Sequence, residues 1–284
     1  MSAAAIYPRL FAKMFASPLM LHGPTRATFE SELITQINSQ RSGMIQPQAA
    51  KHDDEEKEYR QARVFQRVGN VAVISIEGVI DKRVSMMDLN CYGGVDLADV
   101  DEALSQAADP SIAKVLLYIN SPGGSVTGTP ETAARIAALA KTKYVEAFVD
   151  VMACSAGYYL AAQATKITAA PSSVIGSIGV YMAVLDASRA MEIQGYKMQM
   201  ISAGKYKGVG ASWKPLTDEE TEMLQAQVNS MYADFKQAVT SKRPKVSDST
   251  MQGQWFDGAA ADDLYLVDEL SGDTLDERVA RLLV

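Results

Sequence analysis

Three apolar runs, separated from one another by stretches that favour helices, constrain the fold of this sequence most. They are residues 71–76, 115–119 and 144–149. Each carries large or β-branched apolar residues at consecutive positions, which is typical of strands buried on both faces. Because these strands alternate with helices, we expect an α/β fold with a mostly parallel sheet covered by helices.

The helices around these runs have recognisable beginnings. Asp96 can cap a helix that carries Leu97, Val100 and Leu104 and ends before residue 109, and Thr129 can cap another that starts with proline. Thr217 begins a capping box ahead of a long amphipathic helix. Before that helix, residues 197–202 alternate methionines with polar residues, which predicts a further strand.

The N-terminal part of the chain differs from the rest. Apolar residues at helical spacing predict an amphipathic helix over residues 25–37. Residues 39–60 are polar and contain a run of charges, so we interpret them as a solvated linker. We therefore divide the chain into an N-terminal segment, residues 1–63, and a folded domain, residues 64–284.

The composition narrows the class of protein. An apolar content of 48% with 21% charged residues is that of a globular protein, and a formal net charge of −7 argues against a nucleic-acid or anionic-membrane binder. Cys91 and Cys154 give neither a disulfide framework nor metal-ligand spacing. No signal-peptide or membrane-span pattern occurs. We expect a cytoplasmic protein without membrane anchor, metal or cofactor.

Ser155 follows an apolar strand and small residues, and precedes a stretch that suits a helix. Small neighbours allow a sharp strand-to-helix turn that presents the hydroxyl beside free backbone N–H groups. Such a serine is a candidate nucleophile. The alternative is a buried packing turn, and we interpret the adjacent Cys154 as a packing residue.

The loop that contains Gly123 and Gly124 also follows a buried strand. Paired glycines can aim backbone N–H groups into a site, so an oxyanion-binding loop is one interpretation and a plain tight turn is the other. Phosphate binding is disfavoured because neither the P-loop nor the dinucleotide glycine spacing is present.

A nucleophilic serine needs a base, and histidine is scarce here. His22 and His52 both precede the main domain, and either would have to swing in from the N-terminal segment. Lysine is the remaining candidate, and its pKa must then fall from about 10.4 to about 7 through desolvation. Lys205 and Lys207 follow the predicted strand amid small residues, where a solvated loop is the alternative.

Taken in order, four stretches resemble the signal peptide peptidase A family. They read Asn-Ser-Pro-Gly-Gly, Cys-Ser-Ala-Gly-Tyr-Tyr-Leu-Ala, Gly-Ser-Ile-Gly-Val and Gly-Lys-Tyr-Lys, and the resemblance spans residues 64–270. It implies a Clp/crotonase-like fold of repeated β-β-α units and a serine protease with a Ser-Lys dyad.

The resemblance also implies roles for single residues. Ser155 would be the nucleophile and Lys207 the general base, with Lys205 as the alternative base. Ser177 matches the serine that orients the lysine, although it could be a turn residue only. The oxyanion hole would use the N–H of Ala156 together with Gly124, which we prefer, or Gly123.

Within the family, residues 15–21 and the Gly-Ser-Ile-Gly-Val pattern are similar to tailed-phage head-maturation proteases. That branch implies scaffold or capsid polypeptides as substrates, possible self-processing, a homo-oligomeric ring, and action in the host cytoplasm or the procapsid. Three alternatives stay open: a soluble bacterial signal-peptide-peptidase-like protease, a non-catalytic capsid-assembly protein, and a crotonase-type acyl-CoA enzyme.

Overall fold

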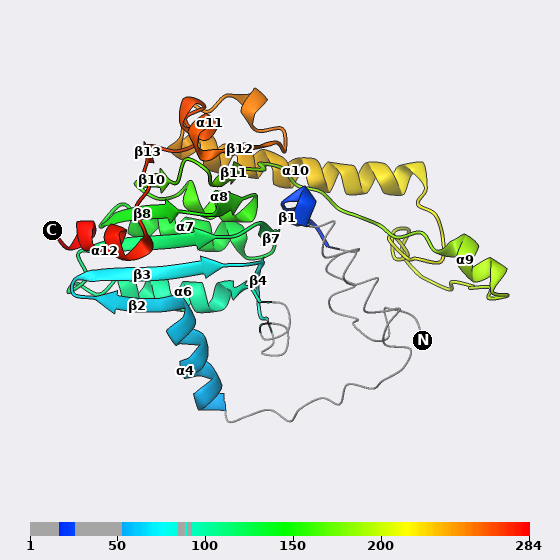
Figure 1. The fold of residues 1–284 in the computed structure, drawn as a ribbon. Coiled ribbons are helices and arrows are strands. Elements are labelled where there is room, and N and C mark those ends of the chain that lie inside the picture. Colours follow the sequence, from blue (N-terminus) through cyan, green and yellow to red (C-terminus); the bar gives the residue numbers. More distant parts are fainter. Residues whose placement is uncertain (1–16, 26–52, 85–88, 90–92) are drawn as a thin grey trace.

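The computed structural model describes residues 17–25, 53–84, 89 and 93–284, which fold around one main sheet (Figure 1). Its helices are α4 (Asp53–Val64), α6 (Leu97–Ala107), α7 (Thr129–Leu139), α8 (Ala156–Ala161), α9 (Ser188–Ile193), α10 (Asp218–Lys242), α11 (Gly258–Asp263) and α12 (Leu275–Leu283). Its strands are β1 (Leu19–Leu21), β2 (Phe65–Val68), β3 (Val71–Glu77), β4 (Ile80–Asp81), β5 (Val95–Asp96), β6 (Lys114–Asn120), β7 (Gly123–Ser125), β8 (Tyr144–Val149), β9 (Met152–Cys154), β10 (Lys166–Ala169), β11 (Val174–Gly176), β12 (Trp255–Asp257) and β13 (Glu269–Leu270).

The main sheet has the strand order β13-β10-β8-β6-β3-β2, and only the edge pair β2–β3 is antiparallel. Two small sheets lie beyond the ends of its strands, with the orders β12-β11-β9 and β1-β7-β4-β5. The predicted α/β fold with a mostly parallel, helix-covered sheet is therefore confirmed.

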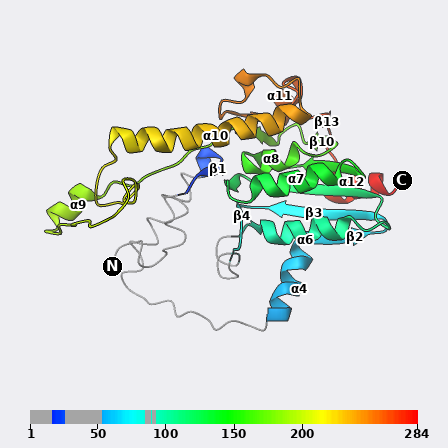
Figure 2. The ribbon, with the colours of Figure 1, turned by 180° about the vertical axis from the view of Figure 1, so that it is seen from behind.

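Side chains alternate between the two faces of the main sheet. Ala72, Ile74 and Ile76 of β3 belong to the larger apolar cluster, which the helices α6, α7 and α8 complete. Val71 and Val73 point to the other face and pack with residues of α12. Figures 1 and 2 show these helices on opposite sides of the sheet. Burial on both faces explains why the strands read as continuous apolar runs.

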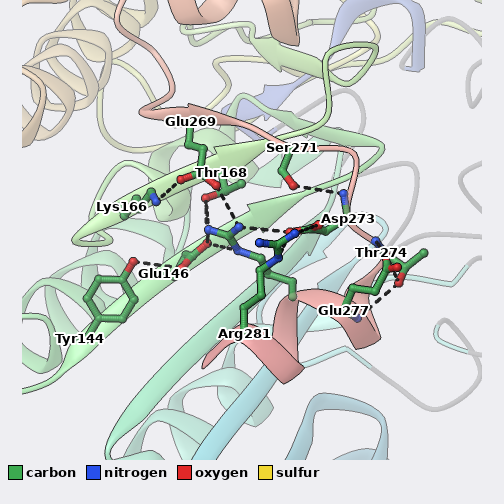
Figure 3. Close-up of polar contacts among 11 residues, drawn as sticks. Tyr144, Glu146, Lys166, Thr168, Glu269, Ser271, Asp273, Thr274, Glu277 and Arg281 are labelled. Atoms are coloured by element: carbon green, nitrogen blue, oxygen red, sulfur yellow. Dashed lines mark hydrogen bonds and ion pairs between the residues drawn. The ribbon is translucent and has the colours of Figure 1, made fainter. Parts of the chain in front are cut away.

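A buried polar network fixes α12 to the sheet (Figure 3). Arg278 of α12 lies with its Nη2 atom 2.5 Å from the Glu146 carboxylate of β8, and it also donates to Thr168 of β10 and to Glu269 of β13. Glu146 and Arg278 are both buried. The C-terminal helix thus ties three neighbouring strands together.

The segment around α9 extends away from the sheet. Both ribbon views show α9 and the first turns of α10 beyond the main body, whereas the later turns of α10 lie against it. In agreement, Phe235 and Val239 near the end of α10 are core residues. We call residues 182–216 the arm.

Three local predictions are wrong. Residues 53–60, which we interpreted as part of the linker, belong to the helix α4, because Arg60 pairs with the buried Asp96, N–O 2.6 Å, and with Asp99, 2.9 Å. Thr129 does not cap α7: the N-cap residue is Gly128, and the Thr129 hydroxyl donates to the Ser125 carbonyl oxygen. Residues 197–202 form no strand, since none of the strands in the described part of the chain pairs with them. Of the helix predicted over residues 25–37, all but Thr25 lies outside the described residues.

The helices of the described residues include none that is both long and apolar enough to cross a bilayer.

Candidate active site

Ser155 lies in a sharp turn between β9 and α8. Its φ of +53° is in the left-handed region that non-glycine residues rarely adopt, and the residue is only 1% exposed. The turn is held because the Ser155 N–H donates to Gly176 O, 2.8 Å, and Tyr159 N–H donates to Ser155 O, 2.9 Å. The predicted strand-to-helix turn is present, with Ala156 as the first residue of the helix.

Ser177 occupies the equivalent position on the neighbouring strand. β9 and β11 run parallel, and the last residue of one, Cys154, is opposite the last residue of the other, Gly176. The two serines therefore leave adjacent strand ends side by side, and Ser177 also has a φ of +53°. Ligands of parallel sheets bind at such carboxyl ends.

The glycine loop lies against this turn. Its Ser121 N–H donates to Met152 O and its Ser121 O accepts from Cys154 N–H, both at 2.9 Å. A Cβ atom placed on Gly123 would lie 2.9 Å from Ser155 Cβ and 3.0 Å from Ala156 N. The backbone of the loop thus approaches the serine as closely as glycine permits.

Gly123 and Gly124 have different surroundings. The Gly123 N–H donates to the Ser121 hydroxyl, 3.1 Å, within the loop. Gly124 follows Gly123 in strand β7, and a Cβ atom placed on Gly124 would lie 1.9 Å from the Ile80 carbonyl oxygen of β4. The Gly123 N–H is thus engaged within its own loop, and the role of Gly124 as oxyanion donor stays a prediction.

Lys207 does not lie with these residues. It belongs to the arm, its side chain is exposed, and within the described part of the chain no hydrogen bond joins it to Ser155 or Ser177. Its role as base stays a prediction. Lys205 pairs with Glu219, and this hydrogen bond raises the pKa of Lys205, the opposite of what a general base needs.

The remaining sequence candidates take other positions. The Cys154 thiol is buried, and desolvation raises its pKa to about 12, as suits a packing residue. His22 packs edge-on against Trp255, with 4.7 Å between ring centroids, and its Nδ1 lies 3.1 Å from Thr25 Oγ1. His52 and Cys91 lie outside the described residues.

Sequence reasoning missed one element of this region, the strand β1. It pairs antiparallel with the glycine strand β7, so Leu21 is opposite Gly123 and Met20 is opposite Gly124. Leu21 also lines a pocket of about 400 Å³ with Ser177, Tyr181 and Trp255. Three residues of edge strand carry no periodicity that could have predicted this pairing.

Ser155 lies in a strained turn at the carboxyl end of a parallel strand, and it faces a glycine strand and a helix N-terminal amide. This arrangement defines the serine hydrolase class of α/β proteins. Comparison with protein families makes the assignment specific. The model of peptidase family S49 matches residues 137–282, just over half of the chain, and the chain therefore belongs to this family of serine proteases.

Three relatives illustrate the match. A protein of the archaeon Methanocaldococcus jannaschii is 37% identical over 57% of this chain and 53% of its own length. Capsid assembly protease C of Escherichia phage lambda is 32% identical over 78% of this chain and 53% of its own length. Protease 4 of Salmonella typhi is 30% identical over 75% of this chain and 34% of its own length. The chain thus spans about half or less of the length of these relatives.

Proposed function

We propose that this chain is a serine endopeptidase whose domain, residues 64–284, uses Ser155 as nucleophile and Lys207 as general base. Neutral Lys207 takes the Ser155 proton as Oγ bonds to a peptide carbonyl carbon. The oxyanion accepts hydrogen bonds from the Gly124 and Ala156 N–H groups. Protonated Lys207 then gives its proton to the leaving amine as the C–N bond breaks, and water hydrolyses the acyl-enzyme.

The observation that carries this proposal is the convergence of backbone amides on a buried, strained serine. The Ala156 N atom, the Ser155 side chain and the glycine strand all lie around one point next to Gly123. Backbone strain at a residue that packing alone does not require is typical of a functional site. Oxyanion stabilisation by fixed N–H groups is the largest contribution that such a site can make to catalysis.

Lys207 reaches Ser155 only if the arm is brought to the serine, and we propose that a second copy of the chain does this. The arm carries large apolar side chains that are exposed, among them Ile193 at 78%, Tyr196 at 66% and Ile201 at 92%. Exposed apolar side chains gathered on one segment commonly mark a site of interaction with another protein. The pocket beside Ser177 offers room for a lysine side chain from the neighbour.

The substrate class that we propose is phage head protein, such as scaffold or capsid polypeptide. In support, the match to the phage lambda capsid assembly protease covers 78% of this chain, compared with 57% for the Methanocaldococcus jannaschii protein. A cellular role in peptide degradation is the alternative within the same family.

The proposal is tested by cleavage of an unfolded protein such as reduced and alkylated casein. We expect Ser155→Ala and Lys207→Ala each to lower the rate by a factor on the order of 10³ or more, because the nucleophile and base act as a unit. Lys205→Ala is the matched control and should retain most of the activity. Equal loss in the two lysine variants, or full activity of Ser155→Ala, would exclude this dyad.

A further inference from the structure

The strand β1 lies in a groove between two backbone segments at the candidate active site. On one side it pairs antiparallel with β7, in the register Met20 opposite Gly124. On the other side, Leu19 N–H donates to Tyr181 O, 2.9 Å, and Tyr181 N–H donates to Leu19 O, 3.1 Å. A segment held through backbone bonds on both edges lies as a peptide does when it adds a strand to a sheet.

The hydrogen bonds that flank this pairing fix which carbonyl faces Gly124. His22 N–H donates to Pro122 O, 2.8 Å, and Val126 N–H donates to Pro18 O, 3.5 Å. In an antiparallel ladder, hydrogen-bonded pairs alternate with non-bonded pairs. The pair of Met20 and Gly124 is therefore of the hydrogen-bonded kind, and the Gly124 N–H faces the Met20 carbonyl.

The same carbonyl also lies beside the serine. A Cβ atom placed on Gly123 would lie 2.1 Å from Met20 O, 2.9 Å from Ser155 Cβ and 3.0 Å from Ala156 N, so these three groups surround one point. The Met20 side chain is 1% exposed and packs in the main apolar cluster. The Met20 carbonyl thus lies next to the predicted oxyanion hole, and the side chain of the same residue fills a buried apolar site.

We propose that β1 occupies the groove for the polypeptide substrate, with Met20 in the place of the residue whose carbonyl Ser155 attacks. This inference rests on the proposed protease function and specifies its substrate. The groove takes an extended segment antiparallel to β7, with a long, unbranched apolar side chain before the cleaved bond. In the single chain this place is taken by the protein's own N-terminal segment, which competes with substrates.

The proposal also identifies a bond for self-cleavage, the one between Met20 and Leu21. Once Lys207 is supplied, Ser155 Oγ bonds to the Met20 carbonyl carbon and its proton passes to the lysine. The C–N bond to Leu21 breaks, and the lysine returns the proton to the new Leu21 amine. Water then releases the Met20 carboxylate and regenerates the serine.

The groove is tested by peptide binding to the Ser155→Ala chain of 284 residues, so that no turnover interferes. The probe is a fluorescent peptide with the sequence of residues 17–24. Two further substitutions, each added to Ser155→Ala, should expel β1. Met20→Asp places a charge in the buried apolar site, and Leu19→Pro removes the N–H that donates to Tyr181 O. Each should then raise the affinity for the peptide at least tenfold. Tyr59→Asp adds the same charge at an exposed site of α4 and is the control, and thermal unfolding verifies the fold of each variant.

A second peptide, with aspartate in place of the methionine, should bind none of the variants. Equal affinity of the wild-type peptide for the opened variants and the Tyr59→Asp control would overturn the proposal, as would failure of the peptide to bind any folded variant. These results do not depend on catalysis. Failure of the protease function itself would instead appear as absent casein cleavage both by the wild-type chain and by Met20→Asp with Ser155 retained, in which β1 no longer blocks the groove, whatever the peptide affinities are.

Discussion

Ser155 and Ser177 share a positive φ, which costs free energy. A non-glycine residue with φ near +53° lies in a sparsely populated region, at a cost on the order of 1–3 kcal/mol. The small residues beside Ser155 made a sharp turn predictable from the sequence. Nothing in the sequence indicated a positive φ at Ser177, because it depends on the register of β11 against β9.

Gly124 gives the first prediction at the residue scale. A Cβ atom at this position would lie 1.9 Å from Ile80 O, so Gly124→Ala must push β7 away from β4 and displace the N–H that faces the oxyanion. We expect kcat/KM for peptide cleavage to fall by a factor on the order of 10²–10³. Gly272→Ala is the control, since its Cβ meets nothing within 4 Å. Unchanged kcat/KM in Gly124→Ala would exclude the donor role.

The residues of the site were predictable to different degrees. Ser155 and the glycine loop follow buried strands, so local pattern and family resemblance sufficed to select them. The place of Lys207 relative to Ser155 was not predictable, since it depends on where the arm packs and not on local sequence. The opposite pKa shift of Lys205 arises from Glu219, fourteen positions further along the chain.

At the scale of elements, the attachment of α12 depends on Arg278. Arg278→Ala leaves the Glu146 carboxylate buried without its guanidinium partner, which typically costs about 3–5 kcal/mol. Arg281→Ala is the matched control, because Arg281 pairs with Asp273 at an exposed position and should cost about 1 kcal/mol or less. Chemical denaturation of both variants measures the difference, and equal losses would contradict this account.

The same network gives a pH prediction. Hydrogen bonds from Lys166 and Arg278 hold the pKa of Glu269 below its usual value. A carboxylate whose folded pKa is depressed stabilises the fold above the pKa of the unfolded state, and this contribution is lost as the pH falls through the folded pKa. We therefore expect the free energy of unfolding to decrease below about pH 4.5. Glu269→Gln should flatten this decrease, and an unchanged pH profile in Glu269→Gln would contradict the prediction.

Elements with a long periodic pattern were predictable, and short or paired ones were not. Three core strands and the long helix α10 follow from apolar runs and from a capping box that the structure retains. The alternation over residues 197–202 predicted a strand that has no partner, whereas β1 forms without any pattern because β7 and Tyr181 supply its hydrogen bonds. Pairing between distant segments decides both cases.

At the scale of the whole molecule, the exposed arm leads to a prediction about assembly. If a neighbouring copy supplies Lys207, then a mixture of inactive Ser155→Ala and inactive Lys207→Ala contains sites with both groups intact. We expect this mixture to recover a measurable fraction of wild-type casein cleavage. Ile201→Asp should weaken both self-association and this recovery, because it places a charge on the apolar arm. A mixture that stays inactive while the variants co-assemble would show that Lys207 acts within its own chain.

The central claim of this account is that Ser155 is a nucleophile without an imidazole base, and covalent labelling tests it most directly. Purified wild-type protein is treated with a fluorophosphonate and digested, and the modified residue is identified by mass spectrometry. We predict a single modification on Ser155 that forms much more slowly in Lys207→Ala. A folded wild-type protein that is not modified, or is modified at another residue while Ser155 stays free, would contradict the claim.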